Sequence, residues 1–218
     1  MDKNQLSINE MRQNYRFDTL SESEAKTNPF EQFNLWFDEV LNSDIREPNA
    51  MTIATVSSEG RPSARTVLLK GYNEEGFIFY TNYESRKGKE LAKNPSIAIL
   101  FFWDVLERQI RIEGKVELLS AEDSDNYFNS RPKGSKIGAI ASPQSQVIPD
   151  RNIIEKNVEY LTEKYQDTEF IPRPEHWGGY KVVPSIFEFW QGRQSRLHDR
   201  LQYLLLADGK WKMERLAP

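Results

Sequence analysis

The sequence predicts a mainly β protein of the α+β class: an antiparallel barrel with helices packed on its outside. Several short segments have the alternation and the β-branched or aromatic content of strands, and most are joined by turn signals typical of hairpins. Few helical segments lie between them, whereas a parallel doubly wound sheet needs a helix after each strand. The length of 218 residues suits one domain, and we expect a flexible arm over residues 1–25 and a single domain over residues 26–218.

The first helix is expected to begin just after Asn28. Asn28 is a good N-cap residue, and Pro29 favours the first helical position. Further helices are expected after Glu84 or Ser85, from Ser120 to near Arg131, and over residues 152–165. Helical spacing in the first helix predicts a buried face made of Phe30, Phe33, Trp36, Phe37, Val40 and Leu41.

Strand alternation assigns side chains to faces of the expected sheet. In the segment 63–70, Arg65 and Lys70 fall on opposite faces, so we expect the two cations to serve different pockets. In the segment 108–119, Gln109 lies on the polar face, and Ile110, Ile112, Val116 and Leu118 form the apolar face. Strands are expected over residues 51–56, 63–70, 77–81, 96–103, 108–119, 180–183, 186–191, 201–206 and 211–216.

Composition excludes several classes of function. The chain has 29 basic and 33 acidic residues and a formal charge of −4, so it lacks the uniform positive field of a duplex-binding surface. It has no cysteine and only two histidines, and we therefore expect no disulfide, no thiolate nucleophile and no metal site. The longest apolar run is too short to span a membrane, and the N-terminus lacks the apolar core of a signal peptide. We expect a cytoplasmic protein with no nucleic-acid or membrane partner.

Two clusters of cations are candidate anion sites. Arg86 and Lys87 follow Ser85 at an expected helix N-terminus, where free N–H groups and positive side chains suit a phosphate; a solvated basic helix face is the alternative. Arg196, His198 and Arg200 fall on one face if that segment is extended, and such a row needs an anionic or electron-rich partner. His198 can equally be a structural histidine.

Nine short motifs, in matching order, resemble the pyridoxamine 5'-phosphate oxidases. The resemblance covers about residues 10–218 and implies a homodimeric, FMN-binding split β-barrel with the cofactor at the subunit interface. It also implies oxidation of pyridoxamine 5'-phosphate or pyridoxine 5'-phosphate to pyridoxal 5'-phosphate, with O2 as acceptor and H2O2 as by-product. The motifs are residues 65–70, 79–82, 85–87, 107–109, 130–132, 144–145, 189–192, 196–200 and 215–218.

The resemblance further implies residue roles. Arg196 and His198 would be catalytic and would border the pyridine ring of the substrate. FMN would be bound by Arg65, Thr66, Val67, Leu68, Lys70, Tyr80, Thr81, Arg86, Lys87, Gln109, Gln144 and Ser145, with Trp190 and Arg200 supplied by the partner subunit. The substrate would be bound by Arg12, Tyr15, Lys70, Tyr127, Arg131, Ser135, Arg196, Leu197 and His198.

Two other functions fit part of this pattern. A split-barrel flavin reductase with a nicotinamide donor would keep the cations at Arg65, Arg86 and Lys87. It would not need the four residues that the resemblance assigns to the substrate phosphate, which are Lys70, Tyr127, Arg131 and Ser135. A non-catalytic flavin or vitamer binder would not need both Arg196 and His198. The sequence also departs from the family pattern at Gln13, Asn14, Ile140 and Pro143, which bears on substrate contacts.

Overall fold

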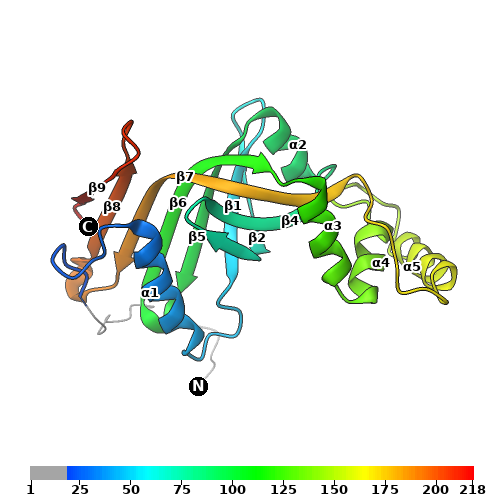
Figure 1. The fold of residues 1–218 in the computed structure, drawn as a ribbon, viewed down its shortest axis with the longest axis horizontal. Coiled ribbons are helices and arrows are strands. Elements are labelled where there is room, and N and C mark those ends of the chain that lie inside the picture. The colour runs from blue at the N-terminus through cyan, green and yellow to red at the C-terminus, as the bar shows by residue number, and fades with distance from the viewer. Residues whose placement is uncertain (1–18) are drawn as a thin grey trace, which may run out of the picture. The chain divides into compact units, whose positions relative to one another are not determined.

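The computed structural model describes residues 19–218, which form two compact units (Figure 1). The first unit holds residues 19–48, 100–112 and 186–218, and the second holds residues 49–99 and 113–185. Most of the expected arm, with Arg12, Gln13, Asn14 and Tyr15, lies outside the described residues. Three strands contribute residues to both units: β5 (Ser96–Trp103), β6 (Arg108–Leu118) and β7 (Trp177–Gln191).

The described residues form one nine-stranded sheet. Its strands follow the order β2-β1-β5-β6-β7-β4-β3, and β8 and β9 continue from β7. The hairpin of β1 (Ala50–Val56) and β2 (Pro62–Leu68) is antiparallel, as are the pairs β3–β4, β4–β7, β7–β8 and β8–β9. The predicted fold class, a mainly antiparallel sheet with peripheral helices, is confirmed. No helix in residues 19–218 is long and apolar enough to cross a membrane.

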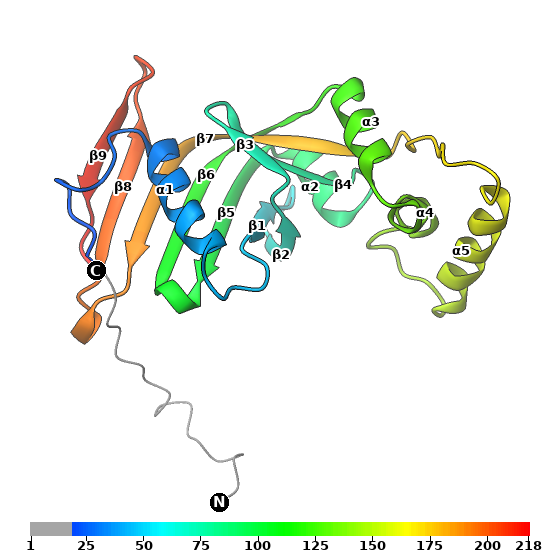
Figure 2. The same ribbon diagram turned by 60° about the horizontal axis from the view of Figure 1, so that its bottom comes forward.

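Helix α1 (Pro29–Leu41) organises the core of the first unit. The Asn28 side chain caps it by accepting a hydrogen bond from the Phe30 N–H, as predicted. Its rings pack edge-on against strand residues, with the Trp36 and Phe189 ring centroids 5.3 Å apart. Leu41 does not belong to the buried face, because it lies in the last turn and is 55% exposed. The unit is completed by the hairpin of β8 (Asp199–Leu205) and β9 (Trp211–Arg215) (Figure 2).

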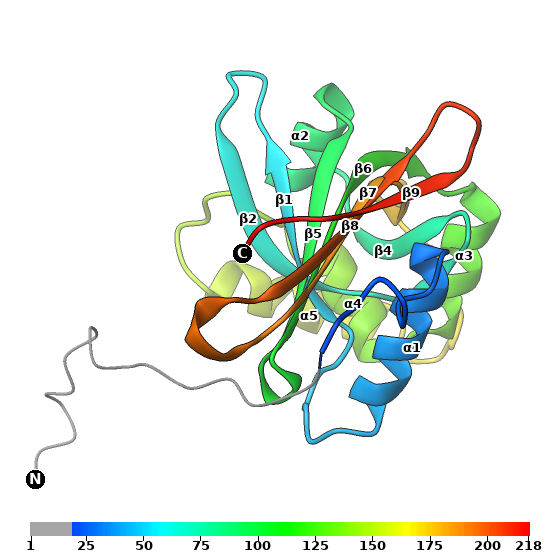
Figure 3. The same cartoon turned by 90° about the vertical axis from the view of Figure 1, so that its left-hand side faces the viewer.

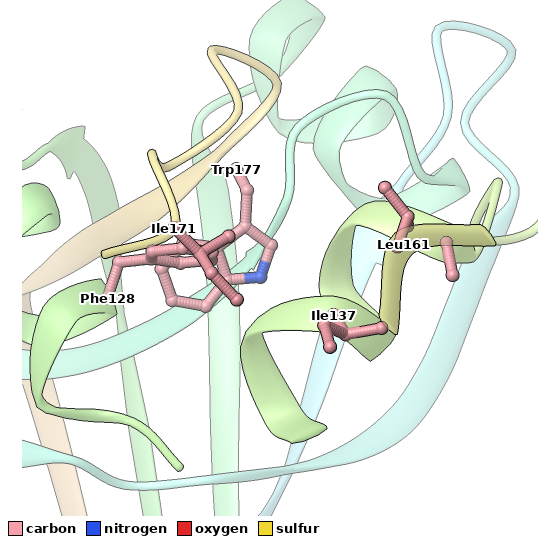
Figure 4. Close-up of a cluster of buried hydrophobic side chains, with 6 residues drawn as sticks. Phe128, Ile137, Leu161, Ile171 and Trp177 are labelled. Atoms are coloured by element: carbon pink, nitrogen blue, oxygen red, sulfur yellow. The ribbon is translucent and has the colours of Figure 1, made fainter. Parts of the chain in front are cut away.

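The second unit contains the hairpin β1–β2, the short strand β3 (Gly71–Asn73), the strand β4 (Gly76–Asn82) and four helices. Helix α2 lies next to β1 (Figure 3). The other three helices enclose an apolar cluster that includes Phe128, Ile171 and Trp177 (Figure 4). The helices are α2 (Arg86–Lys93), α3 (Ala121–Ser130), α4 (Lys133–Ala141) and α5 (Asn152–Lys164).

Several expectations about strands were wrong. The two strands expected over residues 180–183 and 186–191 are one strand, β7. Pro184 does not interrupt β7. The residues of β7 that pair with β4 end at Val182, those that pair with β8 begin at Ile186, and Pro184 lies between them. Leu118 is 64% exposed rather than on a buried face. The sequence patterns also did not predict β3 or α4.

Candidate functional site

A cavity of about 890 Å³ opens in the second unit. This volume is within the roughly 300–1,000 Å³ typical of small-molecule sites. Five of its lining residues are cationic, and none of the described lining residues is a carboxylate, although the chain as a whole is acidic. The predicted site residues that line it are Arg65, Thr66, Val67, Leu68, Lys70, Tyr80, Thr81, Arg86, Lys87, Tyr127, Arg131, Ser135, Gln144 and Ser145.

Arg65 and Lys70 line this same cavity, so the expectation that they serve different pockets was wrong. The alternation argument fails because β2 ends at Leu68 and does not reach Lys70. The Lys70 N–H instead donates to the Ile78 carbonyl oxygen, where the chain turns into β3. The direction of the Lys70 side chain is therefore set by this turn and not by the pleat of the strand.

The N-terminus of α2 forms one end of the cavity lining. Of the two expected starting points, Glu84 and Ser85, it is Ser85 that caps the helix, by accepting a hydrogen bond from the Gly88 N–H. Gly88 is required by packing, because a Cβ there would lie 2.1 Å from the Tyr83 carbonyl oxygen. This close contact holds the first turn of α2, with Arg86 and Lys87, against the segment that follows β4.

Lys87 is a buried cation with three oxygen partners. Its Nζ donates to Thr81 Oγ1 at 2.9 Å, to Gln144 Oε1 at 2.8 Å and to Ser85 Oγ at 3.3 Å. Burial and, to a lesser extent, the nearby charge of Arg65 lower the pKa of Lys87 to about 8. A bound anion would relieve both effects, because it would offset the desolvation and the repulsion between the two cations.

A buried carboxylate ties the two arginines together. Arg86 Nε donates to Glu90 Oε1 at 2.9 Å, and Arg65 Nη2 lies 3.4 Å from Glu90 Oε2. The hydroxyls of Thr55 and Ser63 also donate to Glu90 Oε2, and Arg65 donates to both hydroxyl oxygens. Burial alone would raise the pKa of Glu90, but the hydrogen bonds from Thr55, Ser63 and Arg86 lower it to about 2.

Arg131 lines the cavity between α3 and α4. Its guanidinium carbon lies 4.7 Å from the Trp177 ring centroid and 5.6 Å from that of Phe128. Its Nη1 atom is buried and has no hydrogen-bond partner among the described residues, and burial lowers its pKa. Helix α4 begins directly afterwards with no side-chain cap. A buried Nη1 without a partner among the described residues, beside an uncapped helix N-terminus, fits an anionic ligand.

Three aromatic rings stack along the cavity wall. The Tyr80 and Tyr127 centroids are 3.8 Å apart with the rings inclined by 15°, and Trp177 lies 5.5 Å from Tyr80. The role of Trp177 was missed by sequence reasoning. The following pair of glycines was an available signal, because a Cβ on Gly179 would lie 2.8 Å from Tyr80 Cε1. Such a pair marks close packing of backbone against a ring.

The predicted catalytic residues lie in the first unit. Arg196 is not on an extended strand with His198 and Arg200, so that expectation was wrong: Arg196 belongs to a short 3-10 turn, and β8 begins only at Asp199. Ser195 and Arg196 both have positive φ, 57° and 62°. Such paired left-handed residues are strained and cluster at functional sites.

His198 is held from two sides. Its Nδ1 accepts a hydrogen bond from the Arg193 N–H at 3.1 Å, and its ring centroid lies 4.6 Å from that of Trp190. Burial and the charge of Arg196 lower the pKa of His198. The neutral form with the proton on Nε2 is therefore favoured, and Nε2 is the atom that can donate to a ligand.

Arg200 is anchored by Glu188, whose carboxylate is buried. Arg200 Nε donates to Glu188 Oε1 at 2.8 Å, and Arg111 Nη1 donates to Glu188 Oε2 at 2.9 Å. Gln109 and Leu197 also lie in the first unit, Gln109 half-buried on β6 and Leu197 exposed. The roles of these residues stay predictions, as do those of Arg12 and Tyr15, which lie outside the described residues. Residues 19–218 contain no cluster of three metal-ligating side chains.

Comparison with solved structures identifies the class of fold. PhzG from Burkholderia lata 383, solved in complex with tetrahydrophenazine-1-carboxylic acid, is 30% identical with a TM-score of 0.86 over 92% of this chain and 98% of that one. A pyridoxamine 5'-phosphate oxidase-related, FMN binding protein from Nostoc punctiforme is 17% identical with a TM-score of 0.67, over 88% of this chain and 100% of that one. The fold is thus that of the FMN-binding split barrels, as the resemblance predicted.

Sequence comparison identifies the family. Residues 37–165 match the model of the pyridoxamine 5'-phosphate oxidases, and residues 177–218 match the C-terminal dimerisation region of pyridoxine 5'-phosphate oxidase. The pyridoxine/pyridoxamine 5'-phosphate oxidase of Bordetella petrii is 56% identical over 98% of this chain and 100% of its own length. That of a Cyanothece species is 54% identical over 98% and 99%. The chain belongs to the pyridoxine/pyridoxamine 5'-phosphate oxidase family, and the prediction of an oxidase of this family is confirmed.

Proposed function

We propose that this chain oxidises pyridoxine 5'-phosphate or pyridoxamine 5'-phosphate to pyridoxal 5'-phosphate with FMN bound in the cavity. The alcohol gives up two hydrogens, which reduce O2 to H2O2; the amine does the same and also takes up water and releases ammonia. The observation that carries the proposal is the cavity lining, with its five cations and no carboxylate. The names of the relatives at 54–56% identity support the same reaction.

The residues fit the phosphate of FMN. Lys87 is buried with a lowered pKa, and Arg86 stands at the capped N-terminus of α2. A phosphate there would meet helix N–H groups and cations together, which is the arrangement that binds phosphate in many folds. When bound, FMN supplies the acceptor for the two electrons of the substrate. The protein supplies its position, through Arg65, Arg86 and Lys87 at the phosphate and through Gln144, which accepts from Lys87.

The residues also fit a second phosphate, that of the substrate. Arg131 offers a buried Nη1 that has no hydrogen-bond partner within residues 19–218, and Ser135 lies in the first turn of α4. Lys70 and Tyr127 line the same cavity. We assign these four residues to the substrate phosphate, and the stack of Tyr80, Tyr127 and Trp177 to the wall against which flat rings are held.

His198 and Arg196 orient the reacting group of the substrate. In the arrangement described, His198 Nδ1 is occupied by the Arg193 N–H, so His198 acts as a hydrogen-bond donor through Nε2. Arg196 carries a fixed positive charge and stabilises negative charge on the substrate ring. We propose that the active species is a homodimer in which Trp190 and Arg200 of one subunit reach the flavin of the other. The match of residues 177–218 to a dimerisation region supports this. A cytoplasmic location stays a prediction from the sequence.

One assay separates this function from its alternatives. The purified full-length chain is supplied with FMN and pyridoxine 5'-phosphate in air, and H2O2 and pyridoxal 5'-phosphate are measured together. The proposal expects both in equal amounts, and far less from pyridoxine, which lacks the phosphate. A flavin reductase would form neither product from this substrate and would instead consume a nicotinamide donor when one is added. A non-catalytic binder would take up the vitamer and release no peroxide.

A further inference from the structure

Glu90 lies behind the cations that face the cavity. It is 6% exposed, and it is absent from the residues that line the cavity, whereas Arg65 and Arg86 line it. Its two carboxylate oxygens have different partners. Oε1 accepts from Arg86 in the same helix, and Oε2 accepts from Thr55 on β1 and Ser63 on β2. A single carboxylate thus joins three elements of the second unit.

The hydrogen bonds around Glu90 have one consistent direction. Arg65 Nη1 donates to Thr55 Oγ1 at 2.5 Å, and Arg65 Nη2 donates to Ser63 Oγ at 2.6 Å. Each hydroxyl in turn donates a hydrogen bond to Glu90 Oε2. Glu90 is the final acceptor of both series of hydrogen bonds, one through Thr55 and one through Ser63. Removing its charge therefore leaves the two hydroxyls without their strong acceptor and Arg65 without a fixed orientation.

We propose that Glu90 is a positioning residue for the FMN phosphate, which fixes Arg65 and Arg86 in the orientation that binds it. This inference rests on the proposed binding of FMN in the cavity. Arg86 uses Nε for Glu90, which leaves its Nη groups to reach an anion. Long side chains that are already ordered lose less freedom when the ligand binds, so their contacts contribute more to affinity.

Simple electrostatics predicts the opposite change in FMN affinity when the charge of Glu90 is removed. A carboxylate next to the arginines repels a phosphate, so a charge-removing substitution would strengthen FMN binding if Coulomb forces alone acted. Glu90→Gln keeps the shape and one acceptor for the hydroxyls, but it places an amide NH2 against the Arg86 Nε–H. The direction of the change in FMN affinity therefore distinguishes positioning from repulsion.

The test compares FMN with riboflavin, which has the same ring system without the phosphate. The full-length chain is freed of flavin and titrated with each, with flavin fluorescence as the readout, and the Tm of each variant is recorded. For Glu90→Gln we expect FMN binding to weaken about 5- to 100-fold, equivalent to about 1–3 kcal/mol at ~1.4 kcal/mol per tenfold. Riboflavin binding should change less than about threefold, because positioning acts through the phosphate.

Glu84→Gln is the matched control. Glu84 precedes the same helix and is exposed, and among the described residues its side chain makes no hydrogen bond to Arg65 or Arg86. We expect this variant to bind FMN as the wild type does or slightly more tightly. Should Glu90→Gln fail to fold, Ser63→Ala removes one donor to the carboxylate, and we expect about 2- to 10-fold weaker FMN binding with riboflavin unaffected.

Three results would overturn the inference. Equal or tighter FMN binding by Glu90→Gln would show that the carboxylate only repels the phosphate. Equal weakening of FMN and riboflavin together with a lower Tm would show a purely structural role. A wild-type chain that binds neither flavin would remove the proposed function itself, whereas the first two results leave that function intact.

Discussion

Arg131→Ala and Arg86→Ala are expected to separate two phosphate sites within one cavity. Arg131 stands between α3 and α4 on the Trp177 ring, and Arg86 stands at the start of α2 beside Glu90. The proposed function assigns the first to the substrate phosphate and the second to the FMN phosphate. Arg131→Ala should therefore weaken substrate binding and leave FMN binding unchanged, and Arg86→Ala should weaken FMN binding more than substrate binding.

The structure sets the size of the Arg131 effect. The Nη1 atom of Arg131 is buried and has no hydrogen-bond partner within residues 19–218. A bound phosphate would supply the acceptor for this donor. A charge-assisted hydrogen bond contributes roughly 1.5–3 kcal/mol. At ~1.4 kcal/mol per tenfold, Arg131→Ala should weaken binding of pyridoxine 5'-phosphate about 10- to 150-fold. Arg131→Lys should recover only part of this loss, because a lysine keeps the charge but cannot stack its planar group on Trp177.

The assay is a pair of titrations on each purified, folded variant. FMN affinity is measured by fluorescence on the flavin-free chain, and substrate affinity is measured on the flavin-loaded chain. Unphosphorylated pyridoxine serves as the control ligand, and its weak binding should not respond to Arg131→Ala. If Arg131→Ala lost FMN as readily as Arg86→Ala does, the assignment of two distinct phosphate sites would be wrong.

Three further predictions concern titration, turnover and assembly. A bound phosphate raises the lowered pKa of Lys87, which is about 8 in the free chain, so FMN binding takes up a proton above that pH. Between about pH 7 and 8, where the FMN phosphate is a dianion with a second pKa of ~6, FMN affinity should be nearly constant, and above about pH 8 it should fall by at most about tenfold per pH unit. Neither riboflavin nor the Lys87→Gln variant should show this fall. His198→Asn and Arg196→Ala should lower turnover while flavin content stays near that of the wild type, whereas a purely structural His198 would lower Tm and leave turnover per flavin-loaded dimer unchanged. Size measurement by light scattering should give a dimer as the active species, and a fully active monomer would contradict the contribution of Trp190 and Arg200 across an interface.

Local signals in the sequence were sufficient to predict much of the fold. Asn28 and Ser85 lie at the ends of expected helices, and both side chains accept hydrogen bonds from the first turn. The predicted strands 51–56 and 63–70 pair as the hairpin of β1 and β2, with Ala50 opposite Leu68. These features depend on contacts within a few residues of the chain, and for that reason spacing and residue type predict them well.

The two failures within the predicted site arose where alternation was extended beyond the real end of a strand. Lys70 lies two residues past the end of β2, and Arg196 lies in a turn before β8. A period of two assigns faces only while the backbone stays extended, and positive φ at Ser195 and Arg196 breaks that condition completely. Nothing in the residue types marks this, because neither residue is a glycine and left-handed backbone at other residues is uncommon.

The network around Glu90 shows why the inner part of the site could not be predicted from the sequence. The pair of Arg86 and Glu90 has the i, i+4 spacing of an ordinary exposed helix pair, which contributes only about 0.3–0.5 kcal/mol. The burial of Glu90 depends on the register that sets Thr55 opposite Ser63 and on the packing of α2 against that hairpin. Thr55 is 35 residues from Glu90 along the chain, so no local pattern connects them. The cations of the site follow from local motifs, but their orientation is decided by a tertiary contact, and it is this contact that the comparison of FMN with riboflavin tests.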